Sequence, residues 1–323
     1  MRILFSVVLI PLFFISSSTL AHSFKVPKDV TELALTKISD EVYVVYGMYS
    51  MPDKNNMGFI SNTGIVITEE GVVVFDSGGS KQVGEMLVTR IKQLTDKPVI
   101  ALFNSHIHGD HWLGNAEIRK AYPGVKIYAH QRAIERLKAG EADQWLDIFM
   151  QATDNGIAGT ELVLPDNALK GGETLKIAGK TYKTHHPKHA HTDSDLMLEY
   201  PDGRTLFAGD VVAYGTMVSG ARPEDFSAKG QIEAITYALE LPVDTYVPGH
   251  GPTGGKEIPE ATRRFLKTLY ESVETYYDEG LADFEMRDQV VKDMTEFSEW
   301  NGFDQIGRQI SHIYQQIEAA EFE

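Results

Sequence analysis

Short apolar runs and stretches of helical periodicity alternate along the first half of the chain. Runs rich in β-branched residues predict strands, and apolar residues spaced three and four apart predict helices. The predicted strands are residues 42–46, 58–68, 71–75, 99–103 and 125–129. The predicted helices are residues 81–94, 113–121, 131–139 and 141–151. This alternation of strands and helices is typical of an α/β protein.

The second half of the chain is again rich in predicted strands and ends in helices. Its predicted strands are residues 161–163, 173–177, 180–185, 196–200, 205–208 and 245–247. Its predicted helices are residues 231–239, 258–279, 284–293 and 303–320. Two β-rich halves, each followed by helices, favour a layered α/β sandwich over a doubly wound parallel sheet.

The first 21 residues have the pattern of a secretory signal peptide. Arg2 is their only charged residue, residues 3–15 are almost wholly apolar, and residues 16–21 are mostly small and polar. We expect cleavage after Ala21, because the apolar run is shorter than the roughly 18 to 20 residues that span a bilayer. The mature chain is then expected to be periplasmic or secreted, without a stable membrane anchor.

Composition narrows the possible chemistry. Hydrophobic residues make up 42% of the 323 positions, which is enough for a sizeable core. The 46 acidic residues outnumber the 30 basic ones and give a formal net charge of -16, so nucleic acid is not an expected partner. The chain has no cysteine, which excludes disulfides, thiolate nucleophiles and iron–sulfur clusters. Any metal ion must therefore be held by histidine and carboxylate side chains.

Residues 105–112 place three imidazoles and a carboxylate in one loop, directly after a predicted strand. In an extended backbone, His106 and His108 point the same way and can reach one ion. Asp110 and His111 follow a glycine that permits a turn, so they can face a second ion. A zinc ion takes about four ligands, and a catalytic ion keeps one position open. This loop therefore needs ligands from elsewhere in the chain.

Three later residues have the chemistry of metal ligands and lie at the ends of predicted strands. His191 comes just before one such strand, and Asp210 and His250 each come just after another. Loops at strand ends are where functional residues usually collect. We therefore expect these three side chains to complete the metal site.

Several motifs occur in a fixed order along the chain: His-x-His-x-Asp-His, a later His-Thr, a Gly-Asp after a strand, and Gly-His-Gly. This set resembles the motifs of the metallo-β-lactamase-fold hydrolase superfamily, and segment 62–79 resembles the first motif of that superfamily. The resemblance spans residues 42–252 and implies a four-layer αββα sandwich with a metal site where its two sheets meet. We expect a signal peptide at 1–21, a metallo-β-lactamase-like domain at 22–255, and a helical extension at 256–323 packed on that domain.

Carried over residue by residue, the resemblance implies two metal sites. The ligands of the first ion would be His106, His108 and His191. The ligands of the second ion would be Asp110, His111 and His250, with Asp210 bridging the two ions as in glyoxalase II-like members. The implied cofactor is two zinc ions per chain, with iron as an alternative. A hydroxide held between the ions would be the nucleophile, and Asp110 would act in catalysis by orienting it or carrying its proton.

Other candidate residues surround this implied centre. Segment 47–58 contains three methionines and predicts either an apolar flap, with Met51 contacting substrate, or an ordinary exposed loop. Tyr214 is a second candidate for substrate contact, because its hydroxyl follows Asp210 closely in sequence. Asp76 is expected to brace the metal loops through hydrogen bonds rather than to bind an ion.

Some histidines and the C-terminal helices carry no assigned chemistry. His185, His186 and His189 lack the Thr-Asp sequence that follows His191, and we expect them at the surface or in support of ligands. The last 70 residues contain no obvious ligand, so packing is their expected role. The oligomeric state is left open.

The leading hypothesis is an exported dinuclear zinc hydrolase that cleaves an ester, thioester, lactone or amide bond in a small molecule. Weak β-lactam hydrolysis is an alternative, although Asp210 stands where the main lactamase subclass has a cysteine. A mononuclear iron persulfide oxygenase is another. A third is a non-enzymatic periplasmic metal-binding partner, which the histidines of segment 185–191 suggest.

Overall fold

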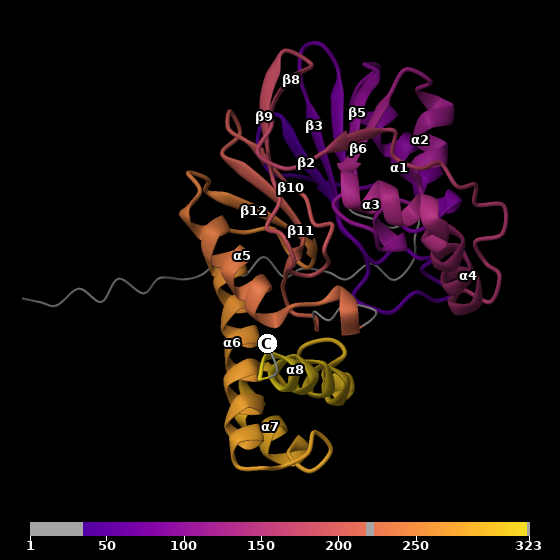
Figure 1. The fold of residues 1–323 in the computed structure, drawn as a ribbon. Coiled ribbons are helices and arrows are strands. Elements are labelled where there is room, and N and C mark those ends of the chain that lie inside the picture. Colours follow the sequence, from indigo (N-terminus) through magenta and orange to yellow (C-terminus); the bar gives the residue numbers. More distant parts are fainter. Residues whose placement is uncertain (1–34, 218–222, 322–323) are drawn as a thin grey trace, which may run out of the picture.

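The structure is a computed structural model that describes residues 35–217 and 223–321. The predicted signal peptide, residues 1–21, lies outside the described residues. Within those two ranges, none of the helices combines the length and the apolar character needed to cross a membrane. Figure 1 shows two sheets with helices around them, and a group of helices that extends below the second sheet.

The first sheet has seven strands that follow one another in sequence order. Its strands are β1 (Leu35–Lys37), β2 (Val42–Val45), β3 (Thr63–Ile67), β4 (Val72–Phe75), β5 (Val99–Phe103), β6 (Lys126–His130) and β7 (Asn167–Leu169). The strands from β1 to β4 pair antiparallel, and those from β4 to β7 pair parallel. The parallel pairs bring the ends of β4 and β5 to the same edge of the sheet, where the predicted metal loop begins.

The second sheet has five strands in the order β12-β11-β10-β9-β8. Its strands are β8 (Thr174–Ile177), β9 (Lys180–His185), β10 (Met197–Tyr200), β11 (Thr205–Ala213) and β12 (Thr245–His250). The pairs from β8 to β11 are antiparallel, whereas β11 and β12 are parallel. The register of that parallel pair shifts between Phe207 and Gly209 and again before Ala213, so the regular ladder is interrupted around Asp210.

The two sheets face each other across an aromatic and aliphatic core. Phe75 on β4 stacks on Phe207 on β11, with 5.5 Å between the ring centroids. A Cβ atom on Gly64 would lie 2.3 Å from the ring of Phe207, so the glycine lets the sheets approach closely. This cluster also includes Val42, Val44, Val66, Phe103, Tyr182, Leu198, Tyr200 and Val247.

Helices cover the outer face of each sheet. Helices α1 (Lys81–Leu94) and α2 (Asn115–Ala121) pack on the first sheet, and α5 (Ala228–Glu240) and α6 (Glu257–Asp278) pack on the second. Helix α1 begins after Ser80, whose hydroxyl accepts the Val83 N–H at 3.2 Å. The predicted α/β fold and its αββα layering are therefore confirmed.

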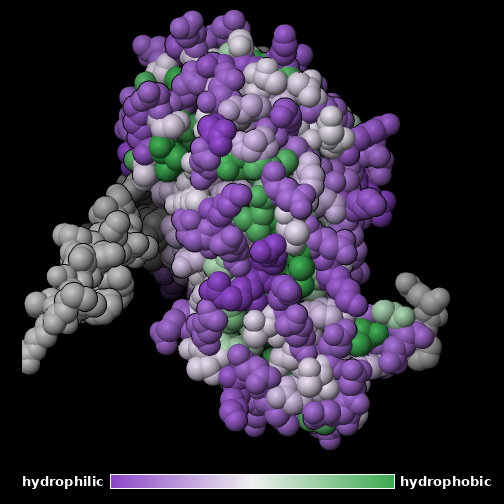
Figure 2. Space-filling view, turned by 90° about the vertical axis from the view of Figure 1, so that its left-hand side faces the viewer, coloured by the Kyte–Doolittle hydropathy of each residue, from purple (hydrophilic) through white to green (hydrophobic). Residues whose placement is uncertain are grey.

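The C-terminal helices share the hydrophobic core of the second sheet. Helices α7 (Arg287–Asp293) and α8 (Ile306–Ala320) follow α6 and lie beside it (Figure 1). One continuous cluster joins Val212 on β11 to Leu269 on α6 and to Ile310 on α8. The face of the molecule in Figure 2 is mainly hydrophilic, and its apolar residues form separate small patches.

Three element boundaries differ from the sequence-based expectations. No strand forms at 161–163, and the strand partner of β6 is instead β7, at Asn167–Leu169. Strand β3 begins only at Thr63. Just before it, the Ile60 carbonyl oxygen pairs with His250 Nδ1 and the Asn62 N–H bonds the Gly249 carbonyl oxygen, so both groups contact the end of β12. The two helices predicted at 131–139 and 141–151 both form, but the first, α3 (Gln131–Arg136), ends earlier than predicted. A wider turn, in which Gly140 has a φ of 115°, separates it from α4 (Ala142–Ala152).

Candidate metal centre

The loop after β5 carries the first four candidate ligands. His106 lies at a bend, His108 has an extended backbone, and the single helical turn Gly109–His111 carries Asp110 and His111. All four side chains are buried. Strand β5 therefore delivers four groups of ligand chemistry to the edge where the two sheets meet.

The second sheet carries the other three candidates to the same edge. His191 lies in the loop before β10, Asp210 lies within β11 where its register shifts, and His250 ends β12. A Cβ atom on Gly249 would lie 1.9 Å from Asp210 Oδ1, so only glycine lets β12 pass this close to the carboxylate. The structure thus brings together all seven residues that the sequence predicted as ligands.

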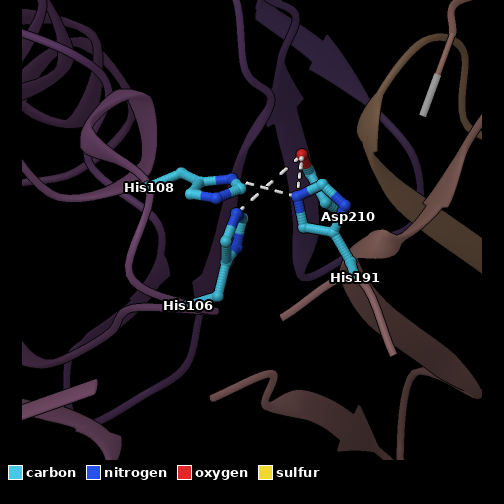
Figure 3. Close-up of side chains that lie close together, drawn as sticks. All are labelled: His106, His108, His191 and Asp210. Atoms are coloured by element: carbon cyan, nitrogen blue, oxygen red, sulfur yellow. Dashed lines mark hydrogen bonds and ion pairs between the residues drawn. The ribbon is translucent and has the colours of Figure 1, made fainter. Parts of the chain in front are cut away.

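The first group contains His106, His108, His191 and Asp210, each of which offers one ligand atom within 4.8 Å of the others. His191 Nε2 lies 3.3 Å from Asp210 Oδ2 and 3.0 Å from His108 Nδ1, as Figure 3 shows. His106 Nε2 lies 3.9 Å from the same Asp210 oxygen. The dashed contacts in Figure 3 therefore converge on one small space between the two sheets.

The second group contains Asp110, His111 and His250. Asp110 Oδ2 lies 3.2 Å from His111 Nε2 and 3.4 Å from His250 Nε2. Asp210 faces this group as well, with Oδ1 at 3.3 Å from His111 Nε2 and Oδ2 at 3.2 Å from His250 Nε2. The carboxylate of Asp210 thus lies between the two groups and contacts both.

Hydrogen bonds on the outer side of the imidazoles orient the inward nitrogens. His111 Nδ1 lies 2.8 Å from Asp76 Oδ2, His250 Nδ1 lies 2.8 Å from the Ile60 carbonyl oxygen, and His106 Nδ1 lies 2.9 Å from Ser105 Oγ. An Nδ1–H donated outward leaves the Nε2 lone pair directed at the centre. Among the described residues, the Nε2 atoms of His106 and His111 and the Oδ1 atom of Asp210 make no contact with hydrogen-bond geometry, although His111 Nε2 lies close to both carboxylates.

The electrostatics of the site favour a bound cation. Burial lowers the pKa of His106 well below its usual value and lowers that of His191 to about 3, so both rings are neutral donors. Burial also acts to lower the pKa of His250, but the charges of Asp210 and Asp110 outweigh it and raise that pKa to about 10. The carboxylates thus attract positive charge, and imidazole with carboxylate is a donor set that suits zinc. The residues present therefore fit a metal centre.

Asp76 lies beneath the loop in the position expected of a supporting residue. Its Oδ1 accepts the Ser105 N–H at 2.8 Å, while its Oδ2 pairs with His111. The φ of Asp76 is 63°, a left-handed conformation that aspartate tolerates better than most residues. The side chain is fully buried and contacts the metal loop at two points.

A second supporting carboxylate, Asp225, has no signal in the sequence motifs. Its Oδ2 lies 3.9 Å from His108 Nε2, and its Oδ1 accepts a hydrogen bond from Arg136 Nη2 at 2.6 Å. Arg136 also bonds Glu141 and Asp193, so the guanidinium holds three carboxylates. Only the fold brings Asp225 to His108.

The remaining histidines of segment 185–191 lie away from the two ligand groups. His185 pairs with Glu199 and with the Tyr237 hydroxyl, and His189 Nε2 lies 2.9 Å from the Asp225 carbonyl oxygen. His186 stacks on His130, with ring centroids 3.7 Å apart. These contacts account for the three side chains without a metal ion.

A cavity of about 710 Å³ opens beside the metal centre. Met51, which is 75% exposed, lies on its wall, in the segment for which the sequence left both a flap and an ordinary exposed loop open. Tyr214 is not among the lining residues; its ring packs at 5.9 Å from that of Trp300, so the structure gives the predicted substrate contact no support. The cavity is also lined from the C-terminal region, for which the sequence predicted packing alone. Those C-terminal lining residues are Asn301, Gly302, Asp304, Gln305, Arg308 and Gln309.

Comparisons with known proteins agree with this geometry. The sequence model of the Metallo-beta-lactamase superfamily matches residues 57–250. The "Metallo-beta-lactamase type 2" of Bacteroides fragilis is 23% identical over 268 residues, which are 82% of this chain and 96% of the relative. A hydroxyacylglutathione hydrolase of Crocosphaera subtropica is 25% identical over 168 residues, covering 51% of this chain and 54% of the relative.

Solved structures share the fold. A metallo-beta-lactamase from Pontibacter korlensis superposes with a TM-score of 0.56 at 24% identity, covering 73% of this chain and 99% of its own. A sec-alkylsulfatase from a Pseudomonas species superposes with a TM-score of 0.68 at 18% identity, covering 88% of this chain and 50% of its own. Because the family match covers more than half of the chain and includes both ligand groups, the protein belongs to the metallo-beta-lactamase superfamily of metal-dependent hydrolases.

Proposed function

We propose that the protein is a dinuclear zinc hydrolase that cleaves an ester, thioester, lactone or amide bond in a small molecule. The observation that carries this proposal is the position of Asp210, whose carboxylate contacts both ligand groups. One carboxylate between two clusters of imidazoles is suited to bridging two cations. The cavity of about 710 Å³ beside it has the size of a small-molecule site.

Each ligand group would hold one ion. His106, His108 and His191 would bind the first, and Asp110, His111 and His250 would bind the second. When bound, the two cations would supply Lewis acidity toward a substrate carbonyl and toward water. Zinc is the expected ion because the donors are imidazole and carboxylate, with iron as the alternative.

The chain itself would orient the reactants and move a proton. Asp110 lines the cavity and lies against His111 and His250, so it can orient an attacking water and accept its proton. Trp145 and Phe149 form an apolar wall next to His108 that limits the access of further water. Hydrolysis would therefore occur where a polar centre meets an apolar wall.

Metal content and hydrolysis, measured on the same samples, test this proposal. We expect about two zinc ions per chain by plasma mass spectrometry, and turnover of members of a panel of thioesters, lactones and β-lactams. Asp210→Asn should lose at least one ion and lower kcat at least about 100-fold, because an amide is a far weaker bridging ligand. Asp40→Asn, at an exposed carboxylate far from the site, is the matched control. A protein that keeps both ions and full activity as Asp210→Asn would exclude the proposal.

Weak β-lactam hydrolysis is the second candidate, and the extent of the match to the Bacteroides fragilis lactamase favours it. Nitrocefin turnover above that of an Asp210→Ala, His106→Ala double variant would support it. A persulfide oxygenase and a metal carrier have less support. Two ligand groups favour two ions over a mononuclear iron centre. The metal-carrier hypothesis rested on the histidines of segment 185–191, and His185, His186 and His189 have protein partners.

Export is part of the proposal. We expect cleavage after Ala21 and a mature protein in the periplasm or outside the cell. Amino-terminal sequencing of the protein released by osmotic shock would show His22 as the first residue. An intact residue 1 in the membrane fraction would instead indicate a retained anchor.

A further inference from the structure

Helix α8 has a glutamine at a position where the amphipathic pattern of the helix predicts an apolar residue. Its buried face is formed by Ile306, Ile310, Ile313 and Ile317, at the spacing of an amphipathic helix. Gln309 falls within this stripe and is only 2% exposed. An aliphatic side chain would be expected there if packing alone determined the residue.

The amide of Gln309 is unsatisfied at both ends. Neither its Nε2 nor its Oε1 has a hydrogen-bond partner in the part of the chain that the structure describes. Buried polar groups are nearly always paired, because an unpaired group loses its hydration without compensation. Gln309 lines the cavity beside the metal centre, so a bound molecule can supply the missing partners.

A second residue that lines the same cavity also has an unsatisfied donor. Trp145 on α4 is 4% exposed, and its indole Nε1 has no hydrogen-bond partner among the described residues. Its ring lies 4.8 Å from that of His108, next to the first ligand group. Unpaired polar atoms therefore lie both next to the ligands and on the C-terminal wall.

The rest of the cavity lining is mixed. Apolar surface comes from Met51, Ile60, Ile148, Phe149 and Met217, and polar groups come from Asn301, Asp304, Gln305 and Arg308. Gln309 differs from Asp304, Gln305 and Arg308 because it is buried rather than exposed and both of its amide atoms are unpaired. Its amide is therefore the group that a buried polar part of the substrate would pair with.

We propose that Gln309 recognises a primary carboxamide, which has an N–H on the same side as its carbonyl oxygen, in the part of the substrate remote from the bond that is cleaved. Gln309 Nε2 donates to the carbonyl oxygen of that carboxamide, and Gln309 Oε1 accepts its N–H. A carboxylate has no hydrogen to give to Oε1, and an ether or alkyl group offers even less. The inference rests on the proposed hydrolase function and adds a substrate class: acyl compounds that carry a remote amide.

Two phenyl thioesters of equal length test this inference. One carries a primary carboxamide, as a carbamoylmethyl group, at the far end of its acyl chain, and the other carries an isobutyl group of the same shape in its place. We expect kcat/KM of the wild type to favour the carboxamide compound by about tenfold, which corresponds to about 1.4 kcal/mol of net hydrogen bonding. The preference should arise from KM, because the scissile bond is the same.

Gln309→Leu is the informative variant, and Gln315→Leu is its matched control. Gln315 lies on the same helix but is exposed and does not line the cavity. We expect Gln309→Leu to reduce the preference to less than about twofold and to raise the melting temperature, because a buried unpaired amide is removed. Gln315→Leu should change neither quantity. An unchanged preference in Gln309→Leu would overturn the inference.

Binding to metal-free protein separates this inference from the proposed function. The two free acids that correspond to the thioesters can be titrated calorimetrically into chelator-treated wild type and Gln309→Leu. Tighter binding of the carboxamide acid to the wild type alone would support the inference even if neither thioester were hydrolysed, a result that would exclude only the hydrolase. Equal binding of both acids to the wild type would overturn it.

Discussion

At the scale of single residues, the outward hydrogen bonds of the imidazoles matter as much as the ligand atoms. Asp76 accepts the Ser105 N–H with one oxygen and pairs with His111 through the other. It therefore fixes both the backbone of the metal loop and the tautomer of one ligand. A residue in this position influences metal affinity without touching the metal.

We predict that Asp76→Asn weakens zinc binding at the second ligand group by about 10- to 100-fold. An asparagine has only one acceptor oxygen, so it cannot serve both the Ser105 N–H and the His111 Nδ1–H, and it lacks the negative charge. Competition with a chromophoric chelator measures the two affinities. Equal affinities in Asp76→Asn and in the surface variant Asp40→Asn would contradict this prediction.

The stacked pair His130 and His186 predicts a loss of stability in acid. Burial, assisted by His186, lowers the pKa of His130 to about 4. Because this folded-state pKa lies below the unfolded value of about 6.5, the unfolded chain takes up the proton first. The free energy of unfolding should therefore fall as the pH decreases from about 6.5 to 4, by at most about 3 kcal/mol from this group.

His130→Asn isolates that contribution, because asparagine can still begin α3 as an N-terminal cap but cannot be protonated. Urea unfolding at several pH values should give a shallower decline for the variant than for the wild type. Parallel profiles would show that the stacked pair does not titrate in this range.

The structure brings together the residues that the sequence predicted for the metal centre, whereas the sequence predicted few of the residues that line the cavity. His106, His191 and Asp210 lie in motifs whose spacing is local, so their chemistry is visible in the chain. Asp225 and Trp145 gain their positions only through folding, and no local pattern marks them. Gln309 is recognisable in the sequence as a polar residue in an apolar helical stripe. The cavity that it lines could not be predicted, because segments far apart in sequence form it.

At the scale of elements, the close contact between α5 and the loop before β10 depends on a glycine. A Cβ atom on Gly230 would lie 1.9 Å from the His189 carbonyl oxygen, which is a backbone atom and cannot rotate away. The Ser227 hydroxyl caps this helix by accepting the Gly230 N–H. The start of α5 is thus fixed against the segment that leads to His191.

We predict that Gly230→Ala lowers the free energy of unfolding by roughly 1 to 3 kcal/mol, through overpacking that outweighs the better helix propensity of alanine. Gly124→Ala is the control, because no atom lies within 4 Å of the added methyl group. Chemical denaturation of both variants measures the difference. A Gly230→Ala protein as stable as the control would mean that the loop moves aside at no cost.

Element types were easier to predict than element limits. The period-two and helical patterns identified most strands and helices, but the expected strand at 161–163 had no partner, and Asn167–Leu169 pairs with β6 instead. Strand β11 continues to Ala213 although Gly209 and Asp210 interrupt its apolar pattern. Pairing between distant segments decides such cases, and a local pattern cannot show it.

At the scale of the whole molecule, the metal centre joins the two sheets. The loop after β5 supplies four ligand candidates, and His191, Asp210 and His250 come from the second sheet. In an unfolded chain these groups are far apart and cannot bind one ion together. Metal binding is therefore expected to stabilise the folded state selectively.

We predict that removing the metal with a chelator lowers the free energy of unfolding, by about 4 kcal/mol per ion when free zinc exceeds its Kd a thousandfold. Returning zinc should restore the melting temperature of the wild type, and should restore that of His106→Ala much less. Calorimetric melting with and without zinc provides the measurement. A melting temperature that zinc does not change would show that the hydrophobic core alone holds the two sheets together.

The ligand candidates form one part of the cavity lining, and other segments of the chain form most of the rest. Those segments are the one around Met51, α4 and residues 301–309, none of which supplies a ligand candidate. During evolution, substitutions and insertions in those three segments can accumulate while the ligands stay in place. A lineage with this architecture can exchange one substrate for another and inherit its reactive centre unchanged.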